Sequence, residues 1–326
     1  MTQNYAAGYA SYVNYGYETT YGAGAVSART FGPGAKITHT RKNNMERIYG
    51  VGARNAVSTV AKKYEGNATV EFVLANASFF RAVLGSAADG GGGGPTYTHT
   101  YSEANVMTSF AIDTGTELGG NDELTELQGC VISSMTLTAA VNELVRVRLE
   151  CPYKTETLAA TTAGSQVAET HTAMTFAQGI VEWTSGGGEI GKVQSIEWTY
   201  NSNSEGIWGV GSRFKAAEVG KTREYNLRLT IAFKDVTELL TKFLGASEAP
   251  IAGTPAPQAN IVLTFDTGGT GADSNKIVIT LANVYFDEET LPKDVNEIIK
   301  EDVGGWALSG TSIMWTNGTT GDSTSP

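Results

Sequence analysis

The stretch Ile48-Tyr-Gly-Val-Gly-Ala-Arg54 returns as Ile207-Trp-Gly-Val-Gly-Ser-Arg213, 159 positions further along the chain. Identical residues recur around it at the same offset and without a gap: Ile37, Thr40, Glu46, Val60, Lys62, Glu65 and Asn67 match Ile196, Thr199, Glu205, Val219, Lys221, Glu224 and Asn226. Matches in this order indicate an internal duplication. Because 326 residues suffice for two domains of roughly 150 residues each, the repeat predicts two similar tandem domains.

Each copy of the repeat continues through a strand-like apolar segment into a short helical pattern. The apolar segments are 69–74 and 228–233, and the helical patterns end at Gly85 and Gly245. Asn76 is expected to cap the first helix, and Gly85 is expected to close it in the left-handed conformation. Asp235 and Glu238 have the spacing of a capping box at the start of the second helix. We therefore expect one short flanking α-helix in each domain.

The composition favours strands and argues against several functions. Thr, Val, Ile and Tyr are frequent and only 17% of residues are charged, which is typical of a mainly β protein. A formal net charge of −11 argues against holding nucleic acid by its phosphates. No apolar run approaches the ~20 residues of a membrane span, and residues 1–15 lack the features of a signal peptide. We expect a soluble protein made inside the cell.

The order of segments predicts the domain boundaries. These are a flexible lead-in at 1–15, a first domain at 16–155, a Thr-, Ala- and Gly-rich linker at 156–174, a second domain at 175–315 and a disordered polar tail at 316–326. Strands are expected at 106–112, 127–138 and 143–150 of the first domain. The polar excursions 51–65 and 210–224 suit long hairpins or flaps. We expect these flaps to become ordered on neighbouring molecules.

A pair of Asp-Thr-Gly motifs is the one constellation that could carry catalysis. Asp113 and Asp266 stand at matching places in the two halves, as in a duplicated aspartic protease whose two carboxylates share a proton. The placement differs from that family, because more than a hundred residues precede Asp113 and only 60 follow Asp266. We favour a turn at the end of a repeated strand. A protease using these two aspartates is kept as an alternative.

Other reactive groups are sparse. The histidines are His39, His99 and His171, and the cysteines are Cys130 and Cys151. None of the histidines has a partner at metal-ligand spacing. Small apolar packing is favoured for the cysteines, and whether they pair stays open. The glycine run at 90–94 lacks the Lys and Ser or Thr that a phosphate loop needs. We predict no catalytic, cofactor-binding or metal residue, no cofactor and no enzymatic activity.

Three segments together resemble the tail tube proteins of long-tailed bacteriophages and archaeal viruses. They are Gly16-Tyr-Glu-Thr-Thr-Tyr-Gly22, the repeated Gly-Val-Gly-x-Arg block with its strand and helix, and Leu127-Gln-Gly-Cys-Val-Ile-Ser-Ser-Met-Thr-Leu-Thr138. The resemblance covers almost the whole chain. It implies a β-sandwich or half-barrel domain with one flanking helix, whose inner sheet joins those of neighbouring subunits around a DNA-conducting channel. Simpler members carry one such domain and form hexameric rings, whereas this chain has two.

Joined to the duplication, the resemblance implies a homotrimeric ring with pseudo-sixfold symmetry, stacked into the tail tube of a virion and made in the host cytoplasm. The implied partners are further copies of the chain, a tape measure protein and genomic DNA in the lumen, a tail terminator, and baseplate or tip proteins. Some of the surplus acidic residues are expected to face the lumen, where they would repel phosphates. An adhesive or decoration β-protein of a surface stays open as a second alternative.

Overall fold

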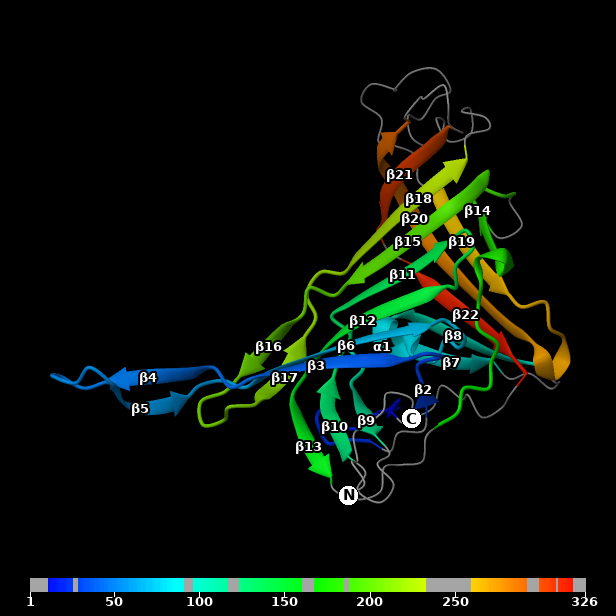
Figure 1. The fold of residues 1–326 in the computed structure, drawn as a ribbon. Coiled ribbons are helices and arrows are strands. Elements are labelled where there is room, and N and C mark those ends of the chain that lie inside the picture. Colours follow the sequence, from blue (N-terminus) through cyan, green and yellow to red (C-terminus); the bar gives the residue numbers. More distant parts are fainter. Residues whose placement is uncertain are drawn as a thin grey trace, which may run out of the picture.

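A computed structural model describes residues 11–25, 29–90, 96–116, 123–159, 167–184, 188–232, 259–291, 299–308 and 310–318. Over these residues the protein is mainly β, as the composition predicts, and its large sheets are antiparallel (Figure 1). The described helices are α1 (Phe80–Leu84) and two short 3-10 turns, η2 (Phe176–Gln178) and η3 (Gly271–Asp273). The helix predicted to end at Gly245 lies outside the described residues.

One long antiparallel surface runs through both halves of the chain. Its strands, in spatial order, are β3 (Lys36–Lys42), β6 (Glu65–Val73), β12 (Arg146–Tyr153), β11 (Ser134–Ala140), β15 (Lys192–Asn201), β18 (Glu224–Ala232), β21 (Lys300–Ala307) and the second half of β20 (Asn275–Thr290). Figure 1 shows this surface as a twisted fan that rises from β3 to β21. The right-handed twist of paired strands gives such a sheet its curvature.

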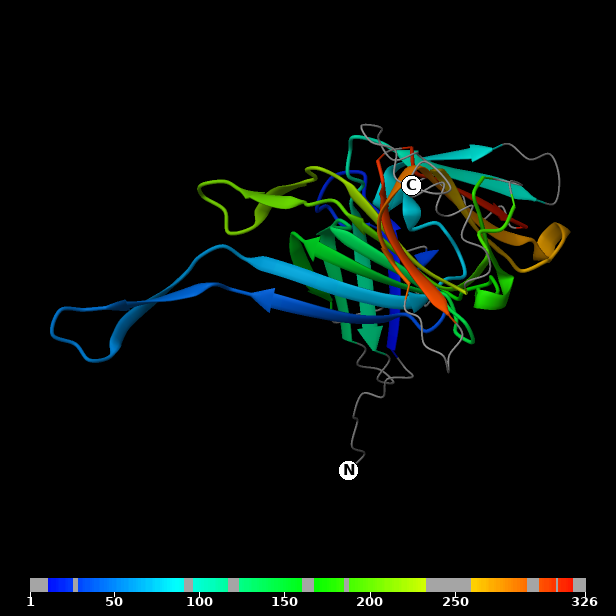
Figure 2. The same ribbon diagram turned by 90° about the horizontal axis from the view of Figure 1, so that it is seen from above.

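A second layer of strands covers one face of the long sheet (Figure 2). In the first half it is a five-stranded sheet with the order β13 (Thr155–Ala159), β10 (Glu123–Cys130), β9 (Phe110–Thr116), β1 (Ser11–Tyr17) and β2 (Arg29–Thr30). In the second half it contains β14 (Gly179–Glu182), β19 (Ala259–Asp266), the first half of β20 and β22 (Ser312–Asn317), extended by β8 (Tyr97–Glu103) and β7 (Gly85–Gly90). Strand β20 passes from this layer into the long sheet and so belongs to both.

Two β-hairpins project from the same end of the long sheet (Figures 1 and 2). One pairs β4 (Met45–Tyr49) with β5 (Ala56–Ala61), and the other pairs β16 (Glu205–Trp208) with β17 (Lys215–Val219). Each hairpin turns at one copy of the repeated Gly-Val-Gly-x-Arg block. The predicted flaps are therefore regular hairpins.

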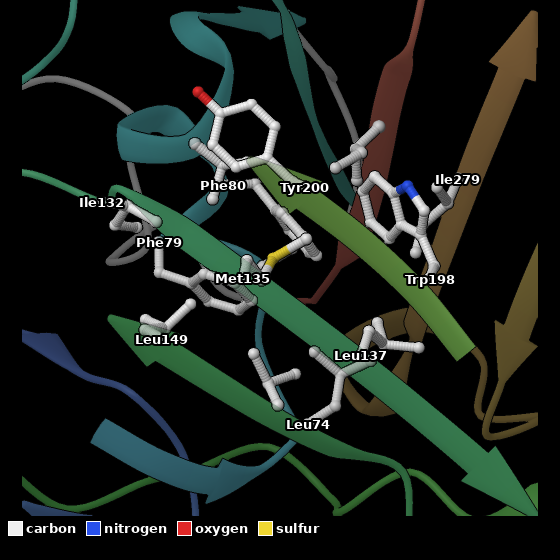
Figure 3. Close-up of a cluster of buried hydrophobic side chains, with 14 of the residues drawn as sticks. Leu74, Phe79, Phe80, Ile132, Met135, Leu137, Leu149, Trp198, Tyr200 and Ile279 are labelled. Atoms are coloured by element: carbon white, nitrogen blue, oxygen red, sulfur yellow. The ribbon is translucent and has the colours of Figure 1, made fainter. Parts of the chain in front are cut away.

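The core lies between the two layers. Along β11, Met135 and Leu137 are fully buried while Thr136 is partly exposed. Burial therefore alternates from one residue to the next, as expected of a strand with one face toward the core. Figure 3 shows these side chains packed with Phe80 of α1 and Trp198 of β15, so the core crosses from one half of the chain into the other. Burial of each large apolar side chain contributes about 1.5–3 kcal/mol.

Several predicted boundaries were displaced. The strand expected at 127–138 is two strands, because Gly129 adopts a φ of 68° and the chain leaves one sheet for the other. The strands expected at 106–112 and 143–150 begin later, at Phe110 and Arg146. Strand β1 includes residues from 11 onward that were expected in the lead-in, β13 uses the start of the expected linker, and β22 takes in the first residues of the expected tail.

The ends of helix α1 were predicted with mixed success. Gly85 closes the helix with a φ of 97° in the left-handed region, as predicted. Asn76 does not cap the helix, because the N-cap position belongs to Phe79. The Asn76 carboxamide oxygen instead accepts a hydrogen bond from the Ser78 backbone N–H at 3.3 Å. Asn76 therefore stabilises the turn that leads into the helix.

Candidate functional site

The long sheet is built from two units that share one strand order. The first unit has the order β3-β6-β12-β11, and the second has the order β15-β18-β21-β20. The offset of 159 places Lys42 of β3 on Asn201 of β15, and an offset of 154 places Arg146 of β12 on Lys300 of β21. The repeat seen in the sequence is thus a repeat of strand connections.

The two units meet edge to edge at strands β11 and β15. Their antiparallel register runs from Ser134 opposite Asn201 to Ala140 opposite Ser195. The ladder is extended at one end by the Ser202 N–H, which donates to the Ser133 carbonyl at 2.8 Å. Backbone hydrogen bonds therefore join the two units along a whole strand, and the junction needs no particular side chains.

This arrangement leaves one edge open at each end of the long sheet. Among the described residues, β3 pairs only with β6, and Tyr285–Thr290 of β20 pair only with β21. In the repeat, β3 corresponds to β15, and residues 288–290 at the end of β20 correspond to residues 134–136 at the start of β11. The open edges are therefore the same two edges that meet inside the chain. An open edge presents unpaired N–H and C=O groups that can pair with another chain.

The two open edges carry opposite charges. Strand β3 has Lys36, Arg41 and Lys42, whereas the end of β20 has Asp287, Glu288 and Glu289. Arg41 is held by Glu156 of β13 at 2.6 Å, which raises the pKa of its guanidinium. Charged residues on an edge strand are a common protection against indiscriminate pairing. Here the two sets are complementary, so they favour pairing of one edge with the other.

A buried carboxyl lies next to the acidic edge. The Glu301 side chain of β21 is buried, and its pKa is raised to about 7, first by desolvation, then by a hydrogen bond to Glu289 and by the charge of that neighbour. Glu289 stands at the position that Met135 occupies in the first unit. The buried Glu301 carboxyl and Glu289 of the acidic edge are therefore close neighbours.

The uncovered face of the long sheet is polar and hollowed. One hollow is lined by residues of β11, β15, β18, β20 and β21, and a second by residues of β6, β11 and β12. Ion pairs cross the second hollow, with Glu71 2.6 Å from Lys36 and 2.9 Å from Arg148. These contacts tie neighbouring strands together across the face.

Charges on the uncovered face are nearly balanced. The basic residues are Lys36, Lys42, Arg146, Arg148, Arg228 and Lys300, and the acidic residues are Glu65, Glu71, Glu150, Glu197, Glu224, Glu288 and Asp302. Over the described strands, the expected surplus of acidic residues does not gather on this face. Alternating signs on neighbouring strands leave it without a strong field of either sign.

The two candidate catalytic aspartates do not form a site. Asp113 is buried in the middle of β9, whereas Asp266 ends β19 in the other sheet, well separated from β9 in Figure 1. Asp266 accepts a hydrogen bond from the Gly268 N–H at 2.8 Å and lies 3.4 Å from the Lys276 ammonium. These contacts make Asp266 part of a turn, the interpretation favoured from the sequence. For Asp113 that interpretation is wrong, because Asp113 lies inside β9 and is paired on both sides. An acid–base pair would need two carboxylates in contact.

The histidines and cysteines take structural places. His99 contacts Asp89 at 2.7 Å, His171 contacts Glu169 at 2.8 Å, and His39 lies on β3 opposite Ala68. Cys130 and Cys151 are free and fully buried, which raises the pKa of both thiols. No group of three His, Cys, Asp or Glu side chains among the described residues could hold a metal ion.

These features define a class of protein. It is a β protein with two similar units, and its extended sheet has two open edges that are equivalent to the edges joined inside the chain. The chain matches the family model described as phage tail tube protein over residues 8–305 and belongs to that family. Membership makes it a structural component of a phage tail. Within the described part of the chain, no helix is both long and apolar enough to span a bilayer.

Comparisons with individual proteins add little. No curated protein matches the chain. Among solved structures, the crystal structure of the P. putida toluene transporter TodX matches with 10% identity, covering 94% of this chain and 77% of that one, with a TM-score of 0.10. So low a score carries no argument about fold or function.

Proposed function

We propose that three copies of this chain close a ring through the open edges of the long sheet, and that stacked rings form the tail tube through which DNA passes. The observation that carries the proposal is the β11–β15 junction, in which two like units already meet edge to edge. The β3 edge of one copy and the β20 edge of the next can repeat that contact. Because identical head-to-tail contacts close by rotation, two units per chain and six units per ring require three chains.

The repeat also supplies the register of the contact between copies. In the internal junction, Ser134 lies opposite Asn201 and Met135 opposite Tyr200. The two offsets place Glu288 and Glu289 at the positions of Ser134 and Met135, and Lys42 and Arg41 at those of Asn201 and Tyr200.

Each predicted pair joins an acidic to a basic residue, Glu288 with Lys42 and Glu289 with Arg41. The charges were not used to derive the register, so their agreement is independent support for it. Opposite charges placed directly across two strands stabilise the pairing, whereas like charges oppose it.

The uncovered face of the long sheet becomes the inner wall in such a ring. Its mixed charges suit a conduit for DNA, because binding of phosphates is built from clusters of Lys and Arg. Basic residues of this face such as Arg148 are engaged by acidic neighbours at 2.9 Å. Over the described strands, phosphates that pass along such a wall would meet no extended basic patch. A tape measure protein, a tail terminator and baseplate or tip proteins are the proposed further partners, with assembly in the host cytoplasm.

Native mass spectrometry of the purified chain tests the ring, with negative-stain microscopy of the same sample. We expect trimers and multiples of three chains, and annular end views that stack into tubes. A stable hexamer as the smallest closed species would contradict the count of units. A protein that stays monomeric at all concentrations would contradict edge pairing itself.

A further inference from the structure

The β16–β17 hairpin lies against the first half of the chain. The Arg213 guanidinium donates from Nε to the Lys62 carbonyl at 2.8 Å and from Nη2 to the Asn43 side-chain oxygen at 2.9 Å. The Tyr64 N–H donates in turn to the Arg213 carbonyl at 2.8 Å. The arginine of the repeated block therefore fastens one hairpin to the base of the other.

Aromatic contacts strengthen this attachment. The Phe214 ring lies 5.5 Å from the Tyr64 ring, and the Lys63 ammonium lies 4.6 Å from the centre of the Trp208 ring. At the start of β17, Lys215 forms a buried ion pair with Glu218 at 2.8 Å. The two side chains are only 4% and 5% exposed, so neighbouring groups cover this part of the hairpin. The hairpin of the second half is thus a docked element.

The β4–β5 hairpin of the first half has the same block but lies open. Figure 1 shows it pointing away from the body of the molecule, past the docked hairpin. Its exposed large apolar residues are Met45, Ile48, Tyr49, Val51, Val57 and Val60. Exposed apolar residues gathered on one hairpin indicate an interaction surface. In the repeat, Arg54 corresponds to Arg213 and Tyr49 to Trp208.

The surface that would receive this hairpin is also present in the chain. The docked hairpin contacts Asn43, Lys62 and Lys63. At the offset of 159 these residues correspond to Ser202, Lys221 and Thr222, at the base of the β16–β17 hairpin. Lys221 and Thr222 are exposed, whereas Ser202 is buried and its hydroxyl donates to the Ser133 carbonyl at 3.0 Å, so the backbone around Lys221 is the acceptor on offer there. A strand-to-strand bond from the Lys221 N–H to the Ser202 carbonyl at 3.0 Å holds this base in place. In a ring closed through β3 and β20, the base of the β16–β17 hairpin of one copy would face the open β4–β5 hairpin of the next copy.

We propose that the β4–β5 hairpin of each copy docks on the base of the β16–β17 hairpin of its neighbour, with Arg54 bonded to the backbone around Lys221 of the partner subunit. This inference rests on the proposed ring. The occupant is a second copy of this chain, because the docked hairpin already shows what the equivalent surface receives. Every hairpin of the ring would then lie on the preceding unit, and the strand junctions would be reinforced by a second set of contacts.

Crosslinking locates the contact. In the Tyr49→Cys, Thr222→Cys double variant, a short bismaleimide should join neighbouring copies into a covalent trimer, because these positions correspond to Trp208 and Lys63. Cys130 and Cys151 are buried and contribute little reaction. Each single variant should give no covalent trimer. The Trp208→Cys, Lys63→Cys variant should crosslink within one chain and serves as the positive control.

The outcomes separate this inference from the proposed ring. Covalent trimers from the double variant support both. Trimers in native mass spectrometry without the crosslink would overturn the docking of the hairpin and leave the ring standing. A monomeric protein without the crosslink would overturn both.

Two matched substitutions on the same hairpin measure the role of the arginine. Arg54→Ala should raise the concentration needed for half assembly at least about tenfold, because a hydrogen-bonded charged group is lost at every junction. Arg47→Ala removes the same charge from β4, at a position that corresponds to Gly206 in the docked hairpin, and should change that concentration less than about twofold. Equal effects of the two variants would show that Arg54 acts only through charge.

Discussion

The predicted register makes Glu288 a sensitive position for assembly. Replacing Glu288 with Lys would place two ammonium groups across the junction, that of the new Lys and that of Lys42 of the partner subunit. Loss of an attractive cross-strand pair and gain of a repulsive one should cost about 1 kcal/mol per junction. A trimer has three such junctions, so the ring loses about 3 kcal/mol, or roughly a hundredfold in its association constant. For a trimer this is about a tenfold rise in the half-assembly concentration.

The assay is the fraction of trimer against protein concentration, measured by mass photometry at low ionic strength. Adding Lys42→Glu to Glu288→Lys exchanges the two charges and should restore assembly, whereas Lys42→Glu alone should weaken it. Asp273→Lys is the matched control, because Asp273 is an exposed residue of η3 away from the open edges and should leave the curve unchanged. Additive losses in the exchanged double variant would refute the pairing of these two residues.

Three further predictions concern the fold. Leu137→Ala should lower the free energy of unfolding by about 2–5 kcal/mol because Leu137 is fully buried, whereas Leu158→Ala at an exposed site should change it by less than about 0.5 kcal/mol in denaturant titrations. Gly85→Ala should cost about 2 kcal/mol or more in the same titrations, because φ is 97° and a Cβ would lie 2.4 Å from the Val106 carbonyl oxygen. Raising the pH from about 4.5 to 7 should remove stability, since folding raises the Glu301 pKa to about 7, and Glu301→Gln should flatten that pH dependence.

The repeated strands could be predicted from the sequence because their side chains recur at a fixed offset or alternate between apolar and polar. Identical residues at one offset located β3 against β15 and β6 against β18, and alternation of apolar residues located β12. The second part of the repeat was harder to predict. There the first half uses two strands, β10 and β11, and the second half uses the single strand β20 of 16 residues. A change of strand connection of this kind leaves no mark in the order of matching residues.

The candidate site could not be predicted from the sequence alone. The β11–β15 junction is made by backbone N–H and C=O groups. Nearly every residue carries both groups, so no side-chain pattern identifies the junction. Both faces of the β4–β5 hairpin are exposed, and for that reason its residues show no period of two that would identify strands. The pairing of Lys42 with Glu288 can be predicted only when the two open edges are known to be equivalent to β15 and β11.

A cryo-microscopy map of the assembled tube would show the contact between copies itself. We expect three chains per ring, with β3 of one copy hydrogen-bonded to the end of β20 of the next and Lys42 opposite Glu288 of the partner subunit. A ring of six chains, or a ring in which β3 and β20 both remain unpaired at their outer edges, would contradict this expectation.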